Sequence, residues 1–132
     1  MVKNKMRKVL AGVLMATTIV GSSCVANAAT TSTSFGTMSY GIQKYSNNTI
    51  HAYTSMPANS KKYSYIRTTL EVQVNSTGEK FAWVSNPVPY SSTKPAYAGI
   101  VSSKSFTTRL AAFTAHEVVG KSSTVKYLST TY

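Results

Sequence analysis

Carboxylate side chains are what this chain has least of. Its 132 residues contain no aspartate and only three glutamates, Glu71, Glu79 and Glu117, against fourteen lysines and arginines. A glycosidase needs two carboxyl groups facing one bond, and Ca²⁺ or Mg²⁺ sites need clustered carboxylate oxygens. The composition therefore argues against both kinds of site, and we expect no bound metal or cofactor.

Cysteine is almost as scarce. Cys24 is the single cysteine, which excludes both a disulfide framework and a thiolate zinc cage. A zinc site would have to use His51 and His116 with one glutamate, a thin set of ligands for a metal that takes three or four. An exported domain without disulfides must be held together by packing alone.

The residues for nucleophilic catalysis are also poorly placed. A Ser–His–acid triad needs a buried acid that orients its histidine. His116 and Glu117 are neighbours, so on a strand they point to opposite faces, and we expect Glu71 and Glu79 to be solvated. The chain has no nucleophile elbow and no glycine-rich phosphate loop. We therefore predict no enzymatic activity and assign no catalytic, cofactor-binding or metal-binding residue.

The N-terminus has the three parts of an export signal. Four cations within the first eight residues precede an apolar run from Val9 to Val20, and Ala26-Asn27-Ala28 is a small-x-small cleavage site. The run is shorter than the ~20 residues that a membrane-spanning helix needs. We predict that residues 1–28 are a helical signal peptide of bacterial type, cut after Ala28. The protein is then secreted, with no transmembrane segment in the mature chain.

Two alternatives to this cut stay open. Cleavage after Ala29 is the neighbouring possibility. A lipid-anchored protein would instead be cut just before Cys24, where Gly21, Ser22 and Ser23 supply small side chains without the usual aliphatic residue.

Removal of residues 1–28 leaves 104 residues with ten cations and three glutamates, a net charge of +7. This part contains 33 serines and threonines and all nine tyrosines, a composition typical of strands. The small polar segment 29–36 is expected to be a flexible start, so the folded domain is predicted to cover residues 37–132.

Alternation of apolar and polar residues predicts the strands. In the clearest one, Ile66, Leu70 and Val72 share a face with Thr68, whereas the residues between them are polar. Asn75 to Glu79 follows as a hairpin loop. Further strands are predicted over residues 38–43, 49–55, 80–85, 97–101, 105–119 and 124–132. The stretch 110–115 also fits a helical turn, although it lacks a cap.

The prolines mark the longest irregular connection. Residues 86–95 contain Pro87, Pro89 and Pro95, and such a segment commonly crosses from one sheet to another. With no helical crossovers, the pattern predicts an all-β fold: a single small antiparallel β-sandwich of six to seven strands after the N-terminal signal helix.

The remaining signal is surface character. A +7 exported protein is attracted to anionic cell-wall polymers or membrane surfaces, whereas export argues against nucleic acid as a partner. Tryptophan and tyrosine rings can stack on sugar or peptide. We therefore name Lys61, Lys62, Arg67 and Trp83 as candidate surface-binding residues of a secreted, non-catalytic protein. The alternative is that tyrosines fill the core and lysines protect sheet edges.

A second function comes from a local resemblance. Residues Gly41 to His51 contain G-x-x-x-Y-S-N, and Trp83 lies beyond them. This stretch, about a tenth of the chain, resembles lactococcin-type bacteriocins, which are exported β-sandwich proteins rich in tyrosine, serine and lysine. The resemblance implies a cationic bacteriocin-like antimicrobial protein that acts on other bacterial cells. It assigns no role to any single residue.

Overall fold

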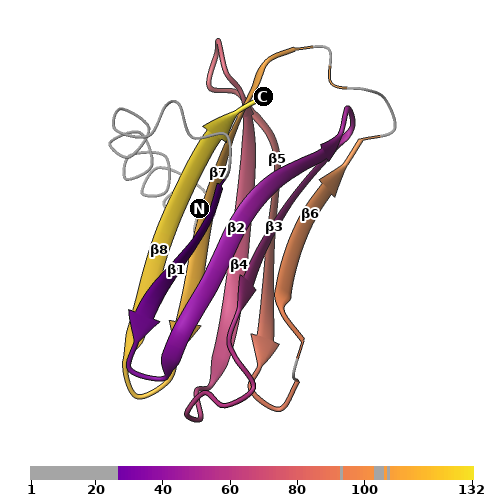
Figure 1. Cartoon of the computed structure of the whole chain (residues 1–132). Helices are drawn as coiled ribbons and strands as arrows, with labels where there is room; N and C mark the ends of the chain where they lie inside the picture. Colours follow the sequence, from indigo (N-terminus) through magenta and orange to yellow (C-terminus); the bar gives the residue numbers. More distant parts are fainter. Residues whose placement is uncertain (1–26, 93, 103–105, 107) are drawn as a thin grey trace.

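Two antiparallel sheets of four strands pack face to face (Figure 1). The computed structural model describes residues 27–92, 94–102, 106 and 108–132. One sheet has the order β1-β2-β3-β6 and the other the order β5-β4-β7-β8. The strands are β1 (Asn27–Thr33), β2 (Gly36–Ser46), β3 (Thr49–Ser55), β4 (Tyr65–Val74), β5 (Lys80–Pro89), β6 (Ala96–Val101), β7 (Leu110–Val119) and β8 (Ser123–Thr131). The predicted all-β sandwich is confirmed, whereas the predicted signal helix lies largely outside the described residues.

The described part of the chain has eight strands rather than six or seven. The additional strand is β1, which pairs with β2 from Asn27 opposite Ile42 to Thr33 opposite Gly36. The segment 29–36, expected to be a flexible start, therefore forms most of β1 and the turn into β2. Every second residue of β1 faces the core, as Ala29 does opposite Tyr40.

The proline segment is also more ordered than its sequence indicates. β5 continues through Pro87 to Pro89, so the irregular connection begins only at Tyr90. A proline is tolerated here because β5 is the edge strand of its sheet. The connection into β6 does cross between the two sheets, as predicted.

The predicted long strand 105–119 is shorter in the structure. β7 begins at Leu110, after Thr108 and Arg109, and residues 103–105 and 107 lie outside the described ranges. The alternative of a helical turn over residues 110–115 is wrong, because they pair with β4 on one side and with β8 on the other.

The core lies between the sheets where the alternation placed it. Ile66, Leu70 and Val72 of β4 are at most 1% exposed. Ile50 of β3 packs against this cluster from the opposite sheet, and Leu110 of β7 packs against it from the neighbouring strand. Leu128 of β8 packs against both of the main buried clusters. A single apolar layer therefore joins the two sheets, which leaves each sheet with one outward face.

Candidate functional site

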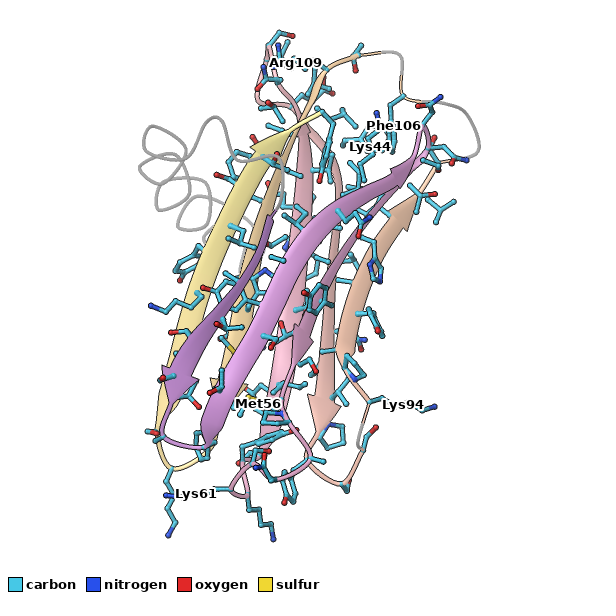
Figure 2. All side chains as sticks on the ribbon, viewed as in Figure 1. Lys44, Met56, Lys61, Lys94, Phe106 and Arg109 are labelled. Atoms are coloured by element: carbon cyan, nitrogen blue, oxygen red, sulfur yellow. The ribbon has the colours of Figure 1, made fainter. Side chains whose placement is uncertain are left out.

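Three loops bring four lysines to one end of the sandwich. Lys61 and Lys62 belong to the β3–β4 loop, Lys94 to the β5–β6 loop and Lys121 to the β7–β8 turn. All four side chains are exposed. Figure 2 shows Lys61 and Lys94 at this end, with Lys44 and Arg109 at the other. We call the four residues the lysine end.

Backbone hydrogen bonds fix these loops relative to one another. The Lys61 N–H donates to the Phe35 carbonyl at 2.7 Å, and the Ser64 N–H donates to the Val119 carbonyl at 2.7 Å. The Tyr90 N–H in turn donates to the Ser64 carbonyl at 3.2 Å. The β3–β4 loop is thus anchored to the β1–β2 turn, to β7 and to the β5–β6 loop.

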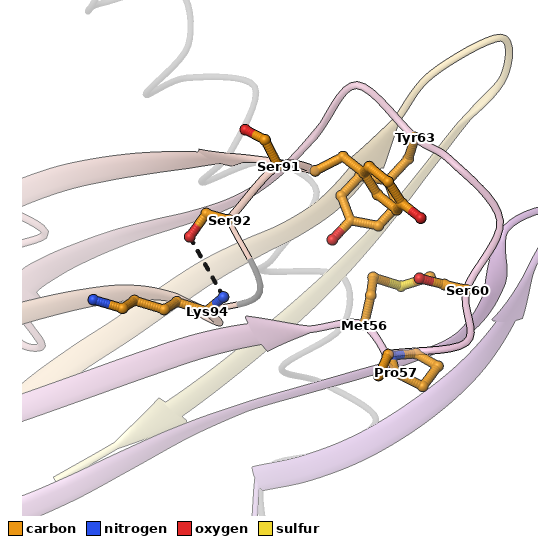
Figure 3. Close-up of a pocket in the computed structure, with 9 residues that line it drawn as sticks. Met56, Pro57, Ser60, Tyr63, Ser91, Ser92 and Lys94 are labelled. Atoms are coloured by element: carbon orange, nitrogen blue, oxygen red, sulfur yellow. Dashed lines mark hydrogen bonds between the residues drawn. The ribbon is translucent and has the colours of Figure 1, made fainter.

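Two tyrosines form an aromatic floor between the lysines. The rings of Tyr63 and Tyr90 are perpendicular, with centroids 4.8 Å apart. A cavity of about 320 Å³ lies against them, bounded also by Met56, Ser60 and Lys94 (Figure 3). A more open groove of about 690 Å³ shares the same tyrosines. It runs between Lys62 and Lys121, so lysines border both hollows.

The position of Tyr63 depends on a close approach at Gly120. A Cβ atom at Gly120 would lie 2.6 Å from Cζ of Phe35 and 3.3 Å from the Cα atom of Tyr63. Glycine is therefore needed where the β7–β8 turn passes beneath the aromatic rings. Phe35 supports Tyr63 edge-on, with ring centroids 6.2 Å apart.

The electrostatics of this end favour anions. Neither hollow has a glutamate among its lining residues. Burial raises the pKa of Tyr63, and the neighbouring Tyr90 phenol adds to the effect, so the Tyr63 ring stays neutral. The cationic charge here is thus not offset by a lining carboxylate.

The four sequence candidates do not share one site. Lys61 and Lys62 belong to the lysine end, but Arg67 lies on the outward face of β4, where it forms an ion pair with Glu117. Trp83 lies on the outward face of β5 with the Lys80 ammonium 5.8 Å from its ring centroid. The charge of Arg67 is therefore already paired.

Sequence reasoning missed four residues of this end: Lys94, Lys121, Tyr63 and Tyr90. The sequence does place each of them in or beside a segment rich in turn residues, which indicates a loop position. What the sequence did not show is which turns meet at the same end of the fold. That depends on the strand order.

Glu71 is buried, contrary to the expectation from the sequence. It was predicted to be solvated, yet it is 1% exposed on the outward face of the central strand β4. Its register neighbours are Trp83 on β5 and Phe113 on β7, and its Oε1 accepts a hydrogen bond from Gln73 at 2.9 Å. Large rings on both adjacent strands flank a carboxylate that alternation alone assigns to water.

His116 is buried among hydroxyl groups, away from any acid. Its Nδ1 lies 3.0 Å from Oγ1 of Thr54, and its Nε2 lies 2.7 Å from Oγ1 of Thr114. Burial lowers its pKa to about 3, against a weaker opposing contact with the Tyr53 backbone, so the ring is neutral at pH 7. Glu117 faces outward, as expected from its neighbouring position in the strand.

The described residues contain no group of three or more His, Cys, Asp or Glu side chains that could hold a metal ion. Nor does any helix within the described ranges have the length and apolar character needed to cross a membrane. Comparison with protein-family models, with curated proteins and with solved structures finds no match to this chain.

Proposed function

We propose that this protein is a secreted, non-catalytic β-sandwich protein that associates with anionic polymers or phospholipid headgroups of the cell envelope through its lysine end. One observation carries the proposal: three loops place four exposed lysines at one end, and Lys62, Lys94 and Lys121 line two hollows that no glutamate lines.

The clustering matters because electrostatic attraction in salt solution is short-ranged. At physiological ionic strength the Debye length is about 8 Å, so charges act together only when they are close. Lysines gathered at one end therefore attract an anionic surface more strongly than the same charges scattered over the molecule. The protein is expected to approach such a surface with its strands end-on.

The aromatic floor adds a contact surface for apolar groups to the attraction between charges. The half-buried Tyr90 ring lies against the buried Tyr63 ring between ammonium groups, so the apolar part of a phosphorylated or carboxylated polymer can contact Tyr90 while its anion meets a lysine. The ammonium groups act as point charges and select no particular anion geometry. This combination suits an anionic polymer better than a small anion.

Sedimentation of the purified protein with bacterial cell walls tests the proposal. We expect binding at low salt that weakens steeply as NaCl rises, because each neutralised anion displaces a counterion. Replacement of all four residues of the lysine end by glutamine should abolish most of this binding. The matched control removes the same number of charges elsewhere: Lys44→Gln, Lys80→Gln, Arg109→Gln and Lys126→Gln.

The outcomes separate the possibilities. Binding to the cell walls that does not weaken as the salt concentration rises overturns the electrostatic proposal. Equal loss in the two quadruple variants shows that net charge matters and the lysine end does not. A growth-inhibition assay on related strains tests the bacteriocin-like alternative, which a clear halo from the wild-type protein would favour.

A further inference from the structure

One outward face of this basic protein has no charged side chain among its described residues. It consists of every second residue of β2 from Thr37 to Gln43, of β3 from Thr49 to Ser55 and of β6 from Tyr97 to Val101. We call this surface the neutral face. It belongs to the sheet β1-β2-β3-β6 and is separate from the loops that form the lysine end.

Three aromatic rings stand together on the neutral face. Tyr97 is 50% exposed, and the His51 ring stacks on it with centroids 4.8 Å apart and planes 27° from parallel. Tyr53 lies directly opposite Tyr97 in the register of β3 and β6. Neighbouring strands hold all three rings, so their spacing is set by the sheet rather than by a loop.

Gly99 places no side chain beside this group of rings. It is exposed and lies opposite His51 in the register. Its φ is not positive, and a Cβ atom there would meet only Cδ2 of His51 at 3.8 Å and the Ile50 carbonyl at 3.9 Å. The fold therefore has no need of glycine at a position where glycine weakens a strand. Glycine in a strand often marks the close approach of a ligand.

Hydroxyl and amide groups accompany the rings. Ser39 and Gln43 lie on the same face of β2, and Ser55 lies beyond Tyr53 on β3. These groups donate and accept hydrogen bonds without charge. Burial lowers the pKa of His51, so its imidazole is also neutral at pH 7.

We propose that the neutral face binds an uncharged polysaccharide chain whose flat pyranose rings stack on Tyr97 and Tyr53. Hydroxyl groups at the edges of the sugar rings would pair with Gln43 and Ser39. A β-1,4-linked polymer fits best, because its extended ribbon presents successive flat ring faces that can stack on the rings held side by side on β3 and β6. The absence of charge on the face fits a ligand that has none, and this site does not depend on the lysine end.

Retention on insoluble chitin and amorphous cellulose tests this site. The assay is run in 0.5 M NaCl (about a threefold shorter Debye length than at 0.05 M), so the lysine end contributes little. We expect the wild-type protein to be retained on at least one polymer, equally at low and high salt, and to be released by the corresponding soluble oligosaccharide. Failure to bind either polymer at micromolar protein overturns the proposal.

Variants locate the binding on the face. Tyr97→Ala should weaken retention about tenfold, because it removes the most exposed ring. Gly99→Glu should weaken it similarly by placing bulk and charge beside His51, whereas Gly99→Ala should not, since the fold has room for that methyl group. Unchanged retention of both Tyr97→Ala and Gly99→Glu, with unaltered circular dichroism spectra, contradicts the assignment.

Two further measurements keep the proposals apart. The variant lacking the four lysines should bind the neutral polymers as the wild type does, and Tyr97→Ala should keep salt-dependent binding to cell walls. Sedimentation velocity tests self-association. If the wild type is a dimer that Gly99→Glu converts to a monomer, the neutral face is an interface between copies and the polysaccharide proposal is wrong.

Discussion

At the scale of single residues, the most informative group is a polar cluster inside the core. Thr54 of β3 and Thr68 of β4 share a hydrogen bond at 2.6 Å across the two sheets, and Thr68 donates to the Ala96 carbonyl of β6 at 2.7 Å. His116 of β7 joins this cluster through Thr54. A satisfied polar network in an apolar core fixes the register of one sheet against the other.

The low pKa of His116 makes stability depend on pH. The unfolded chain binds a proton on this residue below its ordinary pKa near 6.5, but the folded protein does so only near pH 3. The stabilisation is complete above pH 6.5 and is lost as pH falls towards 3. We expect the free energy of unfolding, measured by urea titration, to fall by about 3 kcal/mol between pH 6.5 and 4.

His116→Gln provides the control, because glutamine keeps a donor and an acceptor but has no titrating group. The variant is expected to be less stable at pH 7 and to have a flatter dependence of stability on pH. A wild-type slope that the variant reproduces in full would assign the pH dependence to the glutamates instead.

Alternation placed Thr68 on the core face correctly but failed for Glu71. Thr68 and His116 alternate with residues of the opposite face, so their inward orientation follows from the local sequence. The burial of Glu71 depends on Trp83 and Phe113, which arrive from two other strands. A pattern along one strand contains no information about its neighbours.

At the scale of elements, the edges of the sheets explain the prolines. Pro87 lies opposite Arg67, and Pro89 lies opposite Tyr65. At both positions of β5 a backbone N–H would point away from β4, so a proline, which has no N–H, removes no hydrogen bond to β4. Both prolines therefore interrupt the edge of β5 that does not pair with β4. Next to them, Asn86 donates a side-chain hydrogen bond to the Tyr97 carbonyl of β6 at 2.8 Å, which links the edges of the two sheets.

This arrangement predicts that the prolines limit edge-to-edge association. The double variant Pro87→Val, Pro89→Val should fold normally, since no hydrogen bond to β4 is changed, but should aggregate faster on incubation at 37 °C. Light scattering measures the rate. Pro95→Val, outside any strand, is the matched control and should behave as the wild type does. Equal aggregation of the two variants would contradict a role for the β5 edge.

The same edge shows why the sequence misplaced this segment. Three prolines in ten residues indicate a loop unless the strand is known to lie at an edge, and edge position is a property of the assembled sheet. β1 was missed for a related reason, because its small residues become a strand by pairing with β2. The hairpin loop from Asn75 to Glu79 and the interior strands β3 and β4, whose signals are local, were predicted well.

At the scale of the whole molecule, the grouping of the lysines depends on topology. The β3–β4 and β5–β6 loops each cross between the sheets, and the β7–β8 turn ends at the same side. The sequence provided the turns and the lysines but no strand order, so it predicted Lys61 and Lys62 without their companions. The neutral face likewise appears only when β6 is placed beside β3.

The shared core predicts a single unfolding transition. Trp83 reports on the sheet β5-β4-β7-β8, whereas far-ultraviolet circular dichroism reports on all strands. In urea, the two signals should change together with one midpoint and a slope of about 1–3 kcal/mol per M. A tryptophan transition that precedes the loss of circular dichroism would show that the sheets unfold separately.

β1 has a consequence for the order of events in the cell. The predicted cut between Ala28 and Ala29 falls inside this strand, opposite Gly41 and Tyr40 of β2. A peptidase needs an extended backbone that is free to enter its cleft, and a paired strand is not. If the chain is cut at this bond, the cut must come while residues 27–33 are still unpaired. A chain that folded first would conceal its own processing site.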